Sequence, residues 1–294
     1  MHHEPMPYQM VQRVLVPAAF IFLWSSAYIV VRLNLPDMSP IASLAVRFTI
    51  ATVVLLALAR SAGQPPTVLG RRWPHFVVAG ALMNGIYLAT AYVALQYLAA
   101  GTMGLLAALN PMLTALLGWI ILGERMRLVQ WLGLTLGVTG VVLVVGIAPV
   151  PGRSVPAALL AVGGIVCFAV GTIYFRRYCG GGALLPGNAV QMGSAAVLCA
   201  VLAATVEPFH VAWTWRLIGS TLYLALAVSV GAMGLFGLML RSRTAGVVSS
   251  NFYVIPGLTA VLAWVVLGET LTATAMLGFL VSSVGVWLAQ REVA

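Results

Sequence analysis

The chain is dominated by apolar runs of about 20 residues, each long enough to cross a hydrocarbon layer about 30 Å thick as an α-helix. Hydrophobic residues make up 62% of the 294 residues and charged residues only 7%, a composition that one soluble core cannot bury. The first run is longer than the apolar part of a signal peptide and further runs follow it, so we expect a retained helix. We predict an all-α integral membrane protein with ten transmembrane helices, near residues 14–33, 40–60, 75–97, 102–122, 129–147, 157–175, 186–206, 217–239, 246–267 and 273–290.

The basic residues indicate how the chain is oriented in the membrane. All 15 are arginines, and they gather in alternate loops, as expected because cytoplasmic loops carry the excess of basic residues. With a cytoplasmic N-terminus, the outside loops hold only Arg32, Arg153 and Arg216, and the inside segments hold Arg13, Arg60, Arg71, Arg72, Arg125, Arg127, Arg176, Arg177, Arg241, Arg243 and Arg291. We therefore predict cytoplasmic N- and C-termini. Because the net charge of +9 forms no single basic face, we expect no nucleic-acid partner.

A stretch of about 45 residues occurs twice, beginning at Gly101 and at Gly246, and the copies align without a gap at an offset of 145. Five spans fall in each half, residues 1–148 and 149–294, and an odd number reverses the direction of the second half. We therefore expect two inverted five-helix repeats, which are typical of secondary transporters with a substrate site between the halves. The matched pairs include Pro111 with Pro256, Thr114 with Thr259, Trp119 with Trp264, Glu124 with Glu269, and Gly140 with Gly285.

Arg47 is the one clear charge inside a predicted span. Such a charge is costly in a bilayer, and a substrate carboxylate is one possible partner; the alternative is that Arg47 snorkels outward or binds neighbouring carbonyl groups. The acidic residues all map to tails or loops, so the carboxylate on which a proton-coupled exporter of cationic drugs depends is missing from the span centres. This distribution predicts a cavity for neutral or zwitterionic substrates. The acids are Glu4, Asp37, Glu124, Glu207, Glu269 and Glu292.

Polar and aromatic residues within the spans are the candidates for a substrate-binding cavity. Asn84, Tyr87 and Ala91 share one helical face, where aromatic rings suit the side chain of an amino acid and amides suit its charged groups. The alternative for such residues is hydrogen bonding between helices. The predicted substrate-binding residues are Trp24, Ser25, Arg47, Asn84, Tyr87, Ala91, Asn110, Asn188, Tyr223, Asn251 and Tyr253, and the wider set of polar residues includes Ser26, Tyr28, Tyr92, Gln96, Thr172, Tyr174 and Gln191.

Prolines and glycines mark positions where helices bend or approach closely. Pro111 and Pro256, the latter followed by Gly257, are expected to be hinges, with static kinks as the alternative. A second set of small residues lies at helical spacing in the fifth and tenth spans and predicts either packing within one chain or a homodimer contact. These residues are Gly133, Gly137, Gly140, Gly278 and Gly285. The Cys and His residues are scattered, so we expect no disulfide, metal site, cofactor or enzyme active site.

The run FLWSSAYIVVRLNLPDMSPIASLAVRFTIA, followed by NPMLTALLGWIILGERMRLVQWLGLTLGVTGVVLVV, resembles EamA-type members of the drug/metabolite transporter superfamily over essentially the whole chain. The resemblance implies ten helices in an inverted repeat and export of amino acids or related metabolites by alternating access, with greatest similarity to aromatic and neutral amino-acid exporters. The chain departs from the family pattern at Thr270, which follows Glu269 where the pattern has an arginine. The expected setting is a bacterial inner membrane, as a monomer or homodimer in lipid. The alternatives are a multidrug exporter on this fold, a membrane-embedded enzyme or a channel.

Overall fold

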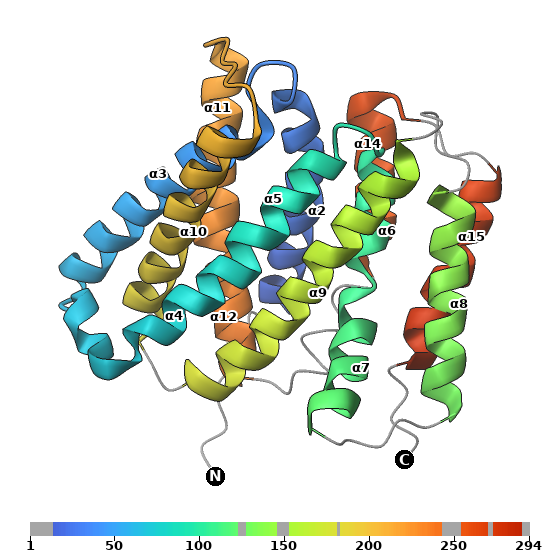
Figure 1. Cartoon of the computed structure of the whole chain (residues 1–294), viewed down its shortest axis with the longest axis horizontal. Helices are drawn as coiled ribbons and strands as arrows, with labels where there is room; N and C mark the ends of the chain where they lie inside the picture. The colour runs from blue at the N-terminus through green and yellow to red at the C-terminus, as the bar shows by residue number, and fades with distance from the viewer. Residues whose placement is uncertain are drawn as a thin grey trace.

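A computed structural model describes residues 14–122, 128–145, 153–180, 183–242, 254–269 and 273–289, and these residues are almost entirely helical (Figure 1). Within these ranges the β structure is a single bridge between Met38 and Val211. Helices are the expected solution because each one satisfies its own backbone hydrogen bonds without water. The elements are α2 (Val16–Asn34), α3 (Pro40–Ser61), η2 (Pro66–Arg72), α4 (Trp73–Gly80), η3 (Ala81–Ile86), α5 (Tyr87–Ala94), α6 (Ala100–Ala107), α7 (Asn110–Leu122), α8 (Leu128–Val145), α9 (Ser154–Tyr178), α10 (Leu184–Val206), α11 (Trp215–Tyr223), η4 (Leu224–Ala232), α12 (Met233–Ser242), α14 (Val254–Leu267) and α15 (Ala273–Ala289).

Six of the described helical stretches are long and apolar enough to cross a membrane, so the chain is a multi-pass membrane protein. Shorter apolar helices add to them, at Leu128–Gly140, Val254–Leu267 and Met276–Gly285. The count of ten spans and the orientation of the termini stay predictions. The six stretches are Val16–Asn34, Pro40–Ser61, Pro66–Ala94, Ser154–Tyr178, Leu184–Val206 and Trp215–Met239.

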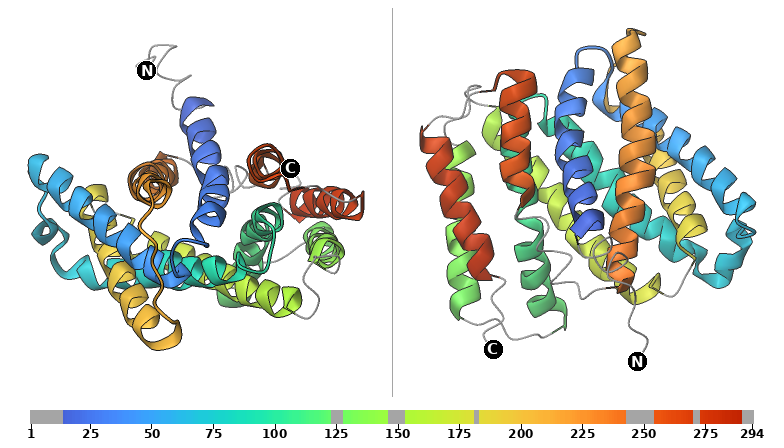
Figure 2. Two further views of the ribbon diagram at one scale, coloured as in Figure 1. Left: turned by 90° about the horizontal axis from the view of Figure 1, so that it is seen from above. Right: turned by 180° about the vertical axis from the view of Figure 1, so that it is seen from behind.

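Several of the contacts between the halves join helices that correspond in the repeat. Helix α3 packs against α10, α6 against α14, and α8 against α15, which lies beside it at one edge of the molecule (Figures 1 and 2). Two of these pairs are antiparallel: Glu207, just after α10, contacts the start of α3, and Glu269, just after α14, contacts the start of α6. Corresponding helices thus run in opposite directions along their shared interfaces.

Two of the spans contain π-helical turns, η3 and η4, at corresponding positions. Residues 81–86 map onto residues 226–231 at the offset of 145, and η4 covers that range. A π turn displaces the ladder of hydrogen bonds and is frequent at functional sites. The π turns are therefore a feature that both halves share and that is typical of functional sites.

Pro111 does not lie inside a continuous helix. The fourth predicted span is broken at Ala108 and Leu109, so Pro111 is the second residue of a new helix, α7, where its missing N–H costs no helical bond. Pro256 is buried and is the third residue of α14. Whether Pro111, Pro256 and Gly257 act as hinges stays a prediction.

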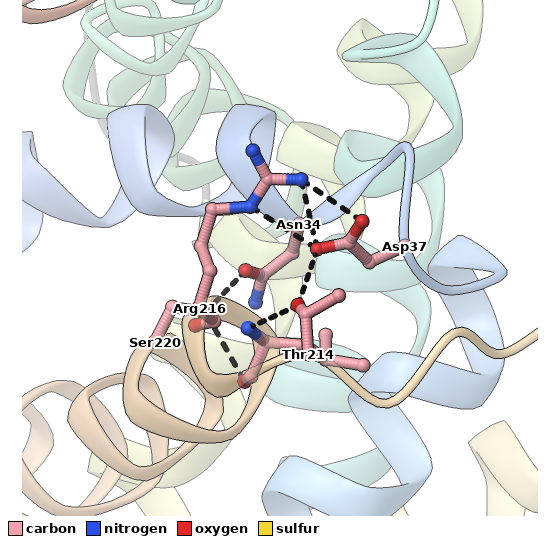
Figure 3. Close-up of polar contacts among 6 residues, drawn as sticks. Asn34, Asp37, Thr214, Arg216 and Ser220 are labelled. Carbon is pink, nitrogen blue, oxygen red and sulfur yellow. Dashed lines mark hydrogen bonds and ion pairs between the residues drawn. The ribbon is translucent and has the colours of Figure 1, made fainter.

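A polar cluster ties the loop after α2 to the start of α11 (Figure 3). Arg216 pairs with the carboxylate of Asp37 at 2.9 Å, and the Thr214 hydroxyl donates to the same carboxylate at 2.9 Å. Thr214 also caps α11 by accepting from the backbone N–H of Leu217 at 3.0 Å. Because Asp37 belongs to the first half and Arg216 to the second, the cluster joins the halves at the end of the molecule where α3 begins.

Candidate functional site

A buried cavity of about 40 Å³ lies between α2, α3, the η3–α5 stretch and the η4–α12 stretch. One water molecule needs about 10–15 Å³ of such space, so the cavity in this conformation holds only a few waters. It is lined by Trp24, Ala27, Tyr28, Val31, Arg47, Met83, Asn84, Tyr87, Leu88, Ala91, Tyr92, Leu95, Val228 and Met233.

Arg47 supplies the charge of the cavity. Its side chain projects from α3 and is only 4% exposed. Its Nε donates to the hydroxyl of Ser229 on η4 at 2.8 Å, and its Nη1 donates to the hydroxyl of Tyr92 on α5 at 2.7 Å. Among the described residues, no ion pair joins Arg47 to a carboxylate. The guanidinium is thus oriented by neutral groups, and its positive charge is not neutralised by a described neighbour.

An aromatic wall faces the same cavity. Trp24 and Tyr28 lie one helical turn apart on α2, and the indole Nε1 donates to the Tyr28 hydroxyl at 3.2 Å. The hydroxyls of Tyr28 and Tyr87 are 3.1 Å apart, which links α2 to α5. The ring of Phe168 on α9 packs behind Tyr87, with 4.8 Å between ring centroids. The cavity therefore combines one cation with large amphipathic rings.

Asn84 adds a polar group with unused hydrogen-bonding capacity. It lies on the π-helical turn η3, is 2% exposed, and its Nδ2 has no hydrogen-bond partner. Its counterpart at the offset of 145 is Ser229, the residue on η4 that accepts from Arg47. Of these two polar residues, Asn84 lines the cavity, and Ser229, which is not part of the lining, accepts a hydrogen bond from Arg47, which is. An unpartnered buried amide is costly unless something else, such as a ligand, satisfies it.

The structure brings together some of the predicted substrate-binding residues and places others elsewhere. Trp24, Arg47, Asn84, Tyr87 and Ala91 line the cavity. The other described members do not line it, and Asn251 and Tyr253 lie outside the described residues.

These other members have local partners or different surroundings. Ser25 donates to the backbone carbonyl of Ile255 at 3.4 Å, and the Tyr223 hydroxyl is 2.7 Å from that of Ser26. Asn188 accepts from Gln191 within α10 at 3.1 Å. Asn110 is buried at the start of α7, and its Oδ1 lacks a hydrogen-bond partner. For Ser25, Tyr223 and Asn188, the structure favours bonds between or within helices.

The cavity also contains residues outside the predicted binding set. Tyr28 and Tyr92 were in the wider polar set, although Tyr28 lies near the end of its predicted span. Ser229, which does not line the cavity but accepts a hydrogen bond from Arg47, was not among the predicted residues. Val228 and Met233 carried no signal, because an apolar residue in an apolar span looks the same at a cavity and at a lipid-facing surface.

Comparisons with known proteins agree with this architecture. A family model described as the EamA-like transporter family matches the chain twice, over residues 14–146 and 155–290. One crystal structure of a protein is similar to 94% of this chain and 96% of its own, with a TM-score of 0.67 and 22% identity, which is a likeness of fold.

Several curated relatives are transporters by name. The uncharacterised transporter YvbV of Bacillus subtilis (strain 168) is 29% identical over 72% of this chain and 70% of its own length. The uncharacterised inner membrane transporter YedA of Escherichia coli (strain K12) is 26% identical over 86% of this chain and 82% of its own. A probable terminal-alkyne amino-acid exporter of Streptantibioticus cattleyicolor is 28% identical over 92% of this chain and 91% of its own. With two family matches that together cover most of its length, the chain belongs to the EamA-like transporter family.

Proposed function

We propose that this protein exports amino acids with aromatic or other neutral side chains, or closely related metabolites, across a bacterial inner membrane by alternating access between two inverted halves. The observation that carries the proposal is Arg47, a buried cation that faces a cavity and lacks a carboxylate partner among the described residues. A substrate carboxylate would neutralise this charge, which no described acid pairs with.

The rest of the lining is complementary to the rest of an amino acid. Trp24, Tyr28 and Tyr87 offer large apolar ring surfaces for a side chain, and ring faces together with hydroxyl oxygens attract an ammonium group. Asn84 has an amide N–H group free to donate to a carboxylate oxygen. The relative named as an amino-acid exporter supports the same substrate class. Because the cavity of about 40 Å³ is too small for such a molecule, binding requires a wider conformation.

The test is counterflow in proteoliposomes, across amino acids, their primary amides and lipophilic cations. We expect exchange of amino acids and not of the amides, which keep the ammonium and side chain but lose the carboxylate. Arg47→Gln should lower the exchange of amino acids about tenfold or more, since a hydrogen bond to a charged group contributes about 1.5–3 kcal/mol. Arg47→Lys, which keeps the charge, should retain more activity than Arg47→Gln at matched membrane abundance.

Two results would contradict the proposal. Exchange of lipophilic cations without amino acids would favour the alternative, a multidrug exporter on the same fold. Equal turnover per molecule by wild type and Arg47→Gln would assign Arg47 a purely structural role, with Tyr92 and Ser229 as its partners.

A further inference from the structure

A second, larger cavity opens at the end of the molecule where α2, α10 and α14 end and α3 begins. This vestibule has a volume of about 930 Å³ and its lining includes Arg32, Ser39, Gln96, Glu207 and Glu269. This end of the molecule is the upper end in Figure 1, opposite the start of α2 and the end of α15. The vestibule is wide enough for a small metabolite, whereas the substrate cavity beneath it is nearly closed.

The linings of the two cavities adjoin along α2 and at the end of α5. Arg32 lines the vestibule, and the preceding residue, Val31, lines the substrate cavity. On the neighbouring α5 stretch, Leu95 lines the substrate cavity and Gln96 lines the vestibule. The Nη1 of Arg32 donates to the backbone carbonyl of Leu95 at 2.5 Å, so this bond crosses between α2 and the end of α5 at the boundary between the cavities.

Glu269 of the second half holds Arg32 in this place. The positive φ of Gly268, 66°, ends α14 and is a conformation that favours glycine. The Glu269 carboxylate then accepts from the backbone N–H of Ala100 at 3.1–3.2 Å, at the start of α6. Its Oε1 lies 3.7 Å from the Nε of Arg32. The carboxylate is fixed mainly by α6 and attracts Arg32 from there.

We propose that Arg32 is a latch that closes the substrate cavity toward the vestibule, and that Glu269 is the positioning residue that holds the latch shut. The Arg32–Glu269 ion pair is long and partly exposed, with side-chain exposures of 31% and 20%, so it is a weak contact that a conformational change can break. When released, the guanidinium moves into the open vestibule, where water hydrates it. When the latch opens, the charge of Arg32 therefore stays in contact with water and is not buried in the apolar interior.

The experiment is thiol labelling of the full-length protein in a background with Cys167, Cys179 and Cys199 changed to alanine. Ala91→Cys reports on the substrate cavity, where Ala91 is 1% exposed, and Gln96→Cys reports on the exposed vestibule wall. A membrane-impermeant thiol reagent is added to the face from which Gln96→Cys is labelled, so no assumption about orientation is needed. In the presence of the native latch, we expect rapid labelling at position 96 and slow labelling at position 91.

Arg32→Gln should raise the labelling rate at position 91 about tenfold, because that rate follows the population of the open form. Glu269→Gln should raise it by a smaller factor, since the bond to Leu95 remains. The matched control is Arg216→Gln, which removes the other described ion pair at this end, Arg216 with Asp37, away from the boundary. It should leave labelling at position 91 unchanged.

Unchanged labelling at position 91 in Arg32→Gln, with position 96 still reactive, would overturn the proposal. So would an equal rise in Arg32→Gln and Arg216→Gln, which would indicate general loosening of this end. If Arg32→Gln is poorly inserted, Glu269→Gln compared with Arg216→Gln decides by the same criterion. The measurement needs no substrate, so it can succeed or fail independently of the amino-acid assignment.

Discussion

Asn84 and Asn188 are both buried asparagines in apolar helices, but the structure gives them different surroundings. Asn188 accepts a hydrogen bond from Gln191, whereas Asn84 lines the cavity and its Nδ2 has no partner. An unsatisfied buried donor lowers stability by about 1–3 kcal/mol, so such a group in a native structure needs an explanation, and a ligand that completes it is one. Asn84 thus has the features of a binding residue and Asn188 those of a structural one.

Asn84→Ala should separate stability from transport. We expect an unchanged or higher melting temperature in detergent, because the substitution removes an unsatisfied amide. The transport rate should fall about tenfold at subsaturating substrate, equivalent to ~1.4 kcal/mol of lost binding. The control is Asn188→Ala, which should lower the melting temperature by leaving Gln191 unpaired, with normal turnover per folded molecule. Loss of stability in Asn84→Ala with normal turnover would contradict this assignment.

Asp37 gives a prediction for pH. Hydrogen bonding from Arg216, and then from Thr214, outweighs partial burial and holds the pKa of Asp37 below its ordinary value. A carboxyl with a lowered pKa in the folded state stabilises the protein above its unfolded pKa of about 3.9, and this stabilisation is lost as pH falls through the folded pKa. Its size is modest, because the Arg216 side chain is 52% exposed and solvent screens the pair.

Asp37→Asn should therefore lower thermal stability near neutral pH by about 1 kcal/mol or less. The difference from wild type should shrink as pH falls below about 4, where the wild-type carboxyl also becomes protonated. Thermal unfolding in detergent between neutral and acidic pH measures this difference and cancels the contributions of the other carboxylates. Curves that stay parallel down to the lowest pH would show that Asp37 does not contribute through its charge.

At the scale of elements, the glycines of α8 and α15 serve packing within the chain. A Cβ built on Gly140 would lie 2.5 Å from the carbonyl oxygen of Gly278 and 2.5 Å from the backbone nitrogen of Ser282. A Cβ on Gly285 would collide with the backbone of Gly137. Because the opposing atoms are backbone, they cannot turn aside as a flexible side chain could. The helices approach as closely as they do because neither residue has a side chain.

Gly140→Ala should destabilise the protein by about 1–3 kcal/mol, the usual cost of overpacking a tight interface. The measurement is the temperature at which half of the detergent-solubilised protein remains monodisperse. Gly163→Ala on α9 is the matched control, because a Cβ there meets nothing within 4 Å, and it should be neutral or slightly stabilising. Equal effects of the two substitutions on stability would contradict the prediction that the close contact between α8 and α15 stabilises the protein.

Whole-molecule architecture shows why part of the structure was readable from the sequence. Apolar runs of membrane-spanning length have few alternatives to a helix, and the helical spacing of Asn84, Tyr87 and Ala91 predicts the shared face with which they line the cavity. The π turns η3 and η4 and the break at Ala108 and Leu109 were not predicted. An i→i+5 turn leaves no periodicity of its own in an apolar run, so the sequence pattern does not reveal it.

The site was only partly predictable for a related reason. A polar residue in a span can serve a cavity or a helix contact, and which role it has depends on rotation and depth that composition does not encode. Tyr28 shows the effect of depth, since it reaches the cavity from near the end of its predicted span. Ser25 directly follows Trp24 and therefore lies on a different face of α2. Its hydroxyl donates to the backbone carbonyl of Ile255 on α14.

The second half of the chain supplies carboxylates that bind backbone amides at two helix starts of the first half. The amides of Ile41 and Ala42 are bound by Glu207, and that of Ala100 is bound by Glu269. During synthesis from the N-terminus, α3 and α6 are therefore made before the carboxylates that bind these amides. Glu269, the partner of α6, is made only near the end of synthesis. The first half can reach its final form only after the second has arrived, so assembly finishes late and at the vestibule.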